Sequence, residues 1–185
     1  MSADLSRLLN AIGLLAIGTV LALAFVDQVW FRDLPSPLPI LQRAGFFAAG
    51  FGVALNLIFG PKPSHYGVAI LGAVAGGTIS AQQILQYVVP GTGSYGNAIF
   101  GLHLYTWAFI AFVFTIVGCA IMMLDNRQFG RTEPLSARLK VLPLSALLLF
   151  LALAIANIFS TIALCGAGLC PDSPTNYMLF DTPPV

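Results

Sequence analysis

The stretch between Lys62 and Asp125 runs for 62 residues without one Asp, Glu, Lys or Arg. A helix needs roughly 20 apolar residues to cross a hydrocarbon core of ~30 Å, so this stretch has room for two spans and a connection. Only 8% of the 185 residues are charged and 58% are hydrophobic, too few charges to cover a soluble domain. We therefore predict an integral membrane protein. This composition excludes a disordered chain, a nucleic-acid-binding protein and a disulfide-dense secreted domain.

Three further uncharged stretches are each long enough for one span, and they cover residues 8–26, 44–61 and 141–164. A dense cluster of turn residues at 90–97 divides the longest stretch in two. The sequence thus predicts an all-α transmembrane bundle within residues 1–164, followed by a tail at 165–185. The expected helices span residues 8–29, 40–60, 66–88, 99–124 and 141–164.

The basic residues predict the orientation, because Lys and Arg collect on the cytoplasmic side of a membrane. Six of them fall in the N-terminus and in the second and fourth connections, and two fall on the other side. The six are Arg7, Lys62, Arg127, Arg131, Arg138 and Lys140, and the two are Arg32 and Arg43. This distribution predicts a cytoplasmic N-terminus and an exported tail, which in a bacterium would lie in the oxidising periplasm.

Arg43 is the charge that most invites a functional interpretation, since it lies three residues into the second expected helix, next to Gln42. Charge within a span is costly, and a guanidinium offers five donors that suit a carbonyl ligand or a lipid phosphate. An anchor that reaches the membrane interface is the alternative. His103 is expected one turn inside the fourth helix at similar depth. His65 is expected on the opposite side, so no two-histidine metal site is predicted.

Cys165 and Cys170 follow the last expected helix closely, and a disulfide between them is expected in an oxidising compartment. The spacing leaves open whether the bond is a structural link or a redox-active pair. Cys119 is expected deep in the fourth helix, out of reach of both. Two thiols without a nearby histidine do not make a zinc site, and no metal is predicted.

The segment 34–46, in which Pro35, Gln42 and Arg43 stand out, resembles the start of the second helix in the DsbB family of disulfide bond formation proteins. There the pattern reads Pro-Cys-x-x-Cys-x-x-x-Arg. Residues 89–96, 101–107 and 165–177 are similar to a subgroup of that family. The resemblance implies four family-like helices plus a fifth, in a bacterial inner membrane.

The family resemblance also implies a function. DsbB-like proteins oxidise a periplasmic dithiol oxidase and pass the electrons to a membrane quinone of the ubiquinone type. The Cys-x-x-Cys pair lies beside the quinone and the arginine helps to bind it, so Gln42, Arg43 and His103 become candidates for a quinone site. By the same resemblance, Cys165 and Cys170 could stand for the second, relaying pair.

The sequence departs from the family pattern where Ser36 and Pro39 occupy the two cysteine positions. Neither side chain forms the thiolate through which disulfide exchange proceeds. Three hypotheses stay open. The chain is a DsbB-like oxidoreductase with reduced or altered activity, or a non-catalytic subunit of a larger membrane complex that keeps a quinone- or lipid-binding surface. A small transporter or channel fits least, because the spans carry almost no polar pathway.

Overall fold

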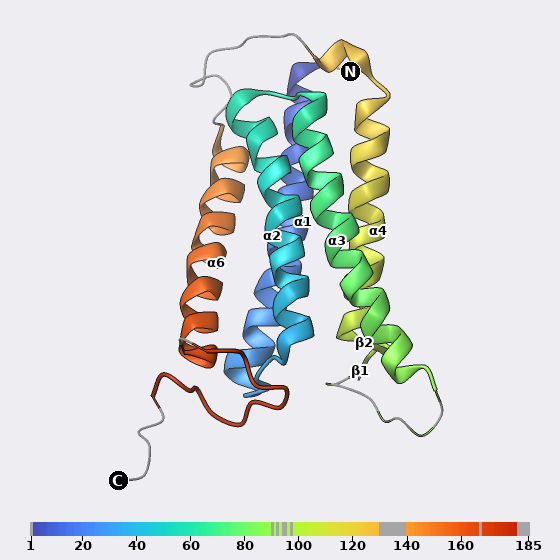
Figure 1. Ribbon diagram of the computed structural model, residues 1–185. Helices are drawn as coiled ribbons and strands as arrows, with labels where there is room; N and C mark the ends of the chain where they lie inside the picture. Colours follow the sequence, from blue (N-terminus) through green and yellow to red (C-terminus); the bar gives the residue numbers. More distant parts are fainter. Residues whose placement is uncertain are drawn as a thin grey trace.

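The computed structural model describes residues 2–89, 91, 93, 96, 98–129, 140–166 and 168–180. Within these residues, five helices are long and apolar enough to cross a membrane: α1 (Ala3–Trp30), α2 (Pro37–Phe59), α3 (Pro63–Tyr87), α4 (Leu104–Met123) and α6 (Val141–Cys165). The predicted all-α bundle of five membrane helices is confirmed (Figure 1). Two of the basic residues used for the orientation and five residues of the predicted turn lie outside the described residues. They are Arg131, Arg138, Pro90, Thr92, Ser94, Tyr95 and Asn97.

Local sequence signals set the helix ends. Ser2 caps α1, and its hydroxyl accepts a hydrogen bond from the backbone N–H of Leu5 at 3.2 Å. A proline opens both α2 and α3, where its missing N–H costs nothing and its fixed φ suits a helix. Gly60 ends α2 with φ at 90°, a conformation that residues with a side chain rarely adopt.

Close contact between α2 and α3 forms the centre of the bundle. A Cβ built on Gly52 would lie 2.4 Å from the backbone N of Ala69, and one on Gly72 would lie 2.5 Å from that of Ala49. Small residues let helices in a membrane approach this closely and gain dispersion energy along their length. Next to this seam, the rings of Phe46 and Phe112 stack with centroids 3.8 Å apart and bring α4 against α2.

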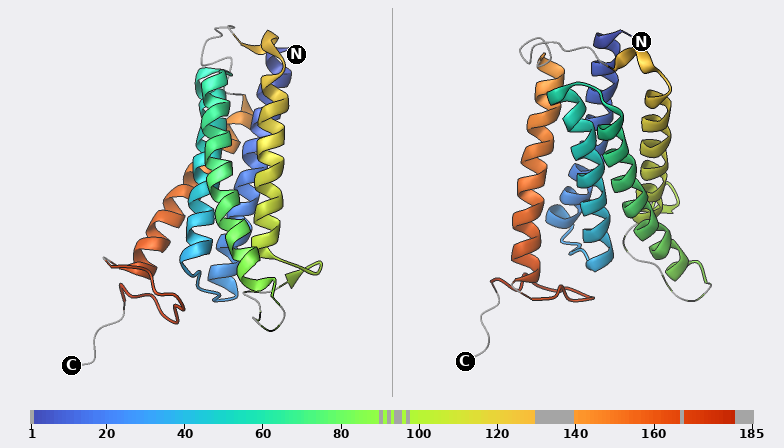
Figure 2. Two further views of the ribbon diagram at one scale, coloured as in Figure 1. Left: turned by 45° about the vertical axis from the view of Figure 1, so that its right-hand side comes forward. Right: turned by 45° about the horizontal axis from the view of Figure 1, so that its top comes forward.

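The other helices flank this central pair. α4 packs mainly on α3, whereas α1 packs on α2 and α6, and contacts between α1 and α4 are sparse. The helix α6 forms the outer edge beside α1, and it is inclined to the other helices in the left-hand view of Figure 2. The described tail, residues 168–180, lies at the end of the bundle opposite the start of α1 (Figure 1).

The expected start of the fourth helix at residue 99 was wrong. Residues Ala98–Ile99 and Leu102–His103 form two short antiparallel strands, β1 and β2, and α4 begins only at Leu104. The turn between the strands holds Phe100 at φ 52° and Gly101 at φ 79°, which no right-handed helix accommodates. His103 is therefore the residue that precedes α4, and does not lie one turn inside it.

A buried polar network joins the helices at the end where α1 begins. Asn10 donates to the Tyr66 hydroxyl at 2.8 Å and accepts from Asn56 at 3.0 Å, and Tyr66 donates to Gln128 at 3.1 Å. These four residues are 5% exposed or less, so each needs the partners it has. Gln128 belongs to a short 3-10 helix, η1 (Asn126–Gln128), which the network ties back to α1 and α3.

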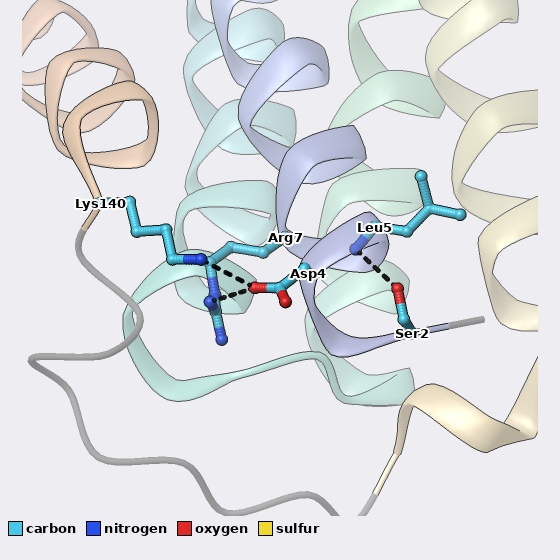
Figure 3. A network of polar contacts seen from close by, with 5 residues as sticks. All are labelled: Ser2, Asp4, Leu5, Arg7 and Lys140. Carbon is cyan, nitrogen blue, oxygen red and sulfur yellow. Dashed lines mark hydrogen bonds and ion pairs between the residues drawn. The ribbon is translucent and has the colours of Figure 1, made fainter.

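At the same end, exposed charges join the starts of α1 and α6. Asp4 accepts from Arg7 and from Lys140, each at 3.2 Å (Figure 3). Such exposed ion pairs contribute little to stability, about 1 kcal/mol or less. The packing of α6 therefore depends on its contacts with α1 further along the helix.

Candidate binding site at Arg43

A cavity of about 500 Å³ opens at the end of the bundle where α2 begins. Residues from α1 to α4 and from the β1–β2 hairpin line it, and most of its wall is apolar or aromatic, including Phe46, Tyr105 and Trp107. Its polar lining consists of Asp27, Asp33, Gln42, Arg43 and Gln83. A largely apolar cavity with a few converging polar groups is the usual form of a small-molecule site.

Arg43 lies in the first half of α2, where its side chain is half-buried between α1 and α6. One terminal nitrogen donates to Gln28 Oε1 at 2.6 Å and to Asn157 Oδ1 at 3.3 Å. The other donates to the backbone carbonyl of Ala24 at 2.7 Å. These contacts fix the plane of the guanidinium at the cavity wall.

The two glutamines of the cavity come from neighbouring helices. Gln42 Nε2 donates to Gln83 Oε1 at 2.6 Å, and the two side chains are 6% and 1% exposed. A buried amide is costly without a partner, and this pair supplies one across the α2–α3 seam. Gln42 and Arg43, which the sequence placed together as candidates, thus line the same cavity.

His103 does not line this cavity. Its ring stacks on Tyr105 with centroids 5.3 Å apart, and Tyr105 in turn stacks on Tyr87. His103 therefore lies behind Tyr105, which lines the cavity, and does not face the cavity itself. Within the described part of the chain, no three His, Cys, Asp or Glu side chains gather as metal ligands.

The Cys165–Cys170 disulfide is present in the structure and lies at the C-terminal end of α6. The chain beyond it folds back onto the helix, where the backbone N–H of Leu179 donates to Ala163 O at 3.0 Å. The Tyr177 hydroxyl accepts from Gln28 Nε2 at 3.1 Å, which links this tail to the partner of Arg43. The free thiol of Cys119 is buried in α4.

The first part of the chain matches a known protein family. The family model for disulfide bond formation protein DsbB matches residues 6–90, which include α2, α3 and nearly all of α1. The chain is a DsbB-like membrane protein. No curated protein and no solved structure matches it. The match covers less than half of the chain and supports a disulfide bond formation membrane protein at family level; α4, α6 and the tail lie outside the matched residues.

The two residues at the family's cysteine positions occupy the start of α2 in this DsbB-like protein. Ser36 is the residue that precedes the helix, and Pro39 follows in its first turn. Pro39 lines the cavity that holds Arg43, whereas Ser36 does not. A group at position 39 thus faces the same space as the arginine, but it carries no thiol.

Sequence reasoning missed Gln28 and Asn157, the two amides that hold Arg43 in this DsbB-like protein. Both are buried, at 2% and 4% exposed. Asn157 is the only amide in the apolar run 141–164, and a lone amide within a span is a signal for a buried partner. That signal does not say which helix supplies the partner, so the pairing needed the structure.

Removal of the disulfide by Cys170→Ser is expected to lower the stability of this DsbB-like protein. Closing so short a loop stabilises a fold by about 2 kcal/mol. For a chain of this size, that corresponds to a fall in Tm of roughly 4–8 °C. Thermal unfolding in detergent measures the change, with Cys119→Ala as the control outside the loop. A reducing agent should lower the Tm of the parent and leave that of Cys170→Ser where it is; an equal response of both would contradict this account.

Proposed function

We propose that this DsbB-like protein binds a membrane quinone of the ubiquinone type in the cavity beside Arg43, and that it does not perform disulfide exchange at positions 36 and 39. The proposal rests on the position of Arg43, a cation fixed in the wall of a largely apolar cavity. A quinone ring is flat and apolar, with two carbonyl acceptors at its edge. It matches an apolar space that contains a guanidinium donor.

The charges around Arg43 favour a neutral carbonyl ligand over a lipid phosphate. Asp27 and Asp33 line the same cavity, so two carboxylates accompany the single guanidinium. A phosphate would meet this negative charge at close range, in surroundings that screen it poorly. A quinone carbonyl meets no such repulsion and still accepts a hydrogen bond. Arg43 would orient the ring, with Gln42 and Gln83 at its side.

A second cavity, of about 530 Å³, offers room for the tail of such a ligand. It shares Val20, Phe46, Ala111 and Phe114 with the first cavity, and it continues between α1 and α4 toward the opposite end of the bundle. Its lining is mostly apolar. An isoprenoid tail that leaves the ring near Phe46 would therefore find an apolar path through the membrane.

The residues of this site do not supply electrons. When bound, a quinone accepts two electrons and two protons, and in the DsbB family a cysteine pair beside it donates them. Ser36 and Pro39 carry no thiol, and the Cys165–Cys170 pair belongs to the tail beyond α6. We propose that a dithiol oxidase or another membrane subunit is the partner. The N-terminus would be cytoplasmic and the tail periplasmic, in a bacterial inner membrane.

The loss of both thiols favours a second candidate, a non-catalytic subunit of a larger membrane complex that keeps the same quinone-binding cavity. The other candidate is an oxidoreductase that acts through the Cys165–Cys170 pair, and the two candidates differ in their partners. Purification in a mild detergent with other membrane subunits would support the subunit function. Cycling of Cys165 and Cys170 between disulfide and dithiol with a soluble partner would support the oxidoreductase function.

Replacement of Arg43 by Met is expected to raise the Kd for decylubiquinone at least tenfold. A hydrogen bond from a charged donor is worth about 1.5–3 kcal/mol, which corresponds to a factor of roughly 10–150. Binding is measured by quenching of the fluorescence of Trp107, which lines the cavity. Arg32→Met is the matched control, because Arg32 is exposed in the α1–α2 connection and does not line the cavity. Equal affinities of the two variants would exclude quinone binding at Arg43.

A further inference from the structure

The contacts of Arg43 reach beyond the part of the chain that matches the family. Asn157 belongs to α6, and the match ends at residue 90. Its Oδ1 accepts from Arg43 at 3.3 Å, while its Nδ2 donates to the Leu153 carbonyl at 2.9 Å. The second bond fixes the amide on its own helix, so the oxygen that faces Arg43 has a defined direction.

Gln28 is held from the same side. Its Nε2 donates to Ser160 Oγ of α6 at 2.6 Å and to the Tyr177 hydroxyl of the tail at 3.1 Å. Its Oε1 is thereby left pointing at Arg43, at 2.6 Å. An amide with both ends engaged cannot rotate freely, and α6 and the tail therefore decide where the acceptor from α1 lies.

The chemistry of these acceptors matters for a ligand. Gln28, Asn157 and the Ala24 carbonyl are neutral, so they hold the guanidinium without cancelling its charge. A bond between a neutral acceptor and a charged donor is also stronger than one between two neutral groups. The arrangement keeps the cation in a fixed place at the cavity wall, where its field acts on a ligand.

We propose that Asn157 of α6, together with Gln28, is a positioning residue that sets Arg43 for a quinone carbonyl in the cavity. This inference rests on the function proposed above. It makes the fifth membrane helix and the tail part of the quinone site, although both lie outside the family match. Without this support, Arg43 could turn away from the cavity, and the ligand would bind less tightly.

The test measures quinone affinity in a Trp30→Phe background, which leaves Trp107 as the only tryptophan of the chain. Each variant is purified in detergent, titrated with decylubiquinone and compared by thermal unfolding. Asn157→Leu is expected to raise the Kd about five- to tenfold, less than the loss of Arg43 itself, because Gln28 and the Ala24 carbonyl still hold the guanidinium. Asn157→Asp keeps the acceptor oxygen but sets a carboxylate against Arg43, which cancels the charge that acts on the ligand, so its Kd is expected to rise as well.

Two further variants separate positioning from a merely structural effect. Ser145→Leu makes a similar polar-to-apolar change on α6, about 18 Å away along the helix, and should leave the Kd unchanged. Ser160→Ala removes one contact of Gln28 with little change in volume, and should raise the Kd about two- to threefold. It also tests the proposal if Asn157→Leu does not fold.

The outcomes distinguish this inference from the proposed function. A weaker affinity in Asn157→Leu, Asn157→Asp and Ser160→Ala, with Ser145→Leu close to the parent, supports positioning. Unchanged affinity in Asn157→Leu together with loss of binding in Arg43→Met overturns positioning and leaves the quinone site intact. Unchanged affinity in Arg43→Met overturns both. A Kd that merely follows the Tm across all variants, Ser145→Leu included, also overturns positioning.

Discussion

Gly52→Ala is expected to destabilise the folded bundle by about 3 kcal/mol, an overpacking cost at the upper end of the usual range. The added Cβ would lie 2.4 Å from the backbone N of Ala69 and 2.6 Å from the carbonyl oxygen of His65. Both are backbone atoms of α3, so no side chain can turn aside to make room. The two helices would have to separate along the seam on which the other helices pack.

Thermal unfolding in detergent checks this expectation, and Gly67→Ala is the matched control. Gly67 lies in α3, but a Cβ built on it would meet no atom within 4 Å. Alanine favours a helix over glycine by about 1 kcal/mol, so the control should be as stable as the parent or slightly more stable. Equal Tm values for the two variants would mean that α2 and α3 do not approach as closely as the structure shows.

The double variant Ser36→Cys, Pro39→Cys is expected to gain quinone reductase activity at least tenfold above the parent when a dithiol reductant is supplied. Two thiols would become a disulfide and the quinone would become a quinol, which balances two electrons and two protons. Residues three apart in a first helical turn lie on one face, so the two thiols would be close enough to form that disulfide. Position 39 already lines the cavity of Arg43.

Quinone absorbance under anaerobic conditions measures this activity. The parent chain, which keeps Cys165 and Cys170, gives the background, and each single cysteine variant should stay at that background. Arg43→Met in the double-cysteine chain should remove most of the gain, because the ring would lose its donor. A variant that forms the disulfide yet reduces no quinone would show that no quinone approaches residue 39.

The membrane spans could be predicted from the sequence because charge is excluded from a hydrocarbon core over a known length. The gaps 8–26, 44–61 and 141–164 each held one helix for that reason. The hairpin before α4 escaped prediction, since Ile99 and Leu102 are apolar and look like part of a span. The left-handed backbone of Phe100 and Gly101 keeps these residues out of α4, and the apolar composition of the segment does not reveal it.

The candidate site was predictable to the extent that it depends on residues close together in the sequence. Gln42 and Arg43 stood out as polar residues at the start of a span, and the family pattern around Ser36 and Pro39 gave them a function. The contacts with Gln28 and Asn157 join residues 15 and 114 positions away from Arg43. A single sequence does not specify which helices are neighbours, so these partners appear only in the folded chain.

The sparse contact between α1 and α4 determines how a ligand would reach Arg43. Leu23 of α1 and Phe114 of α4 line the cavity and are 60% and 72% exposed on the outer, lipid-facing surface of the bundle. An apolar ligand can therefore enter sideways from the bilayer, without crossing water. Along this route it displaces lipid chains, and its occupancy depends on its mole fraction among the lipids. Dissociation constants measured in nanodiscs at different ratios of lipid to protein should agree only when the ligand concentration is expressed as its mole fraction in the lipid.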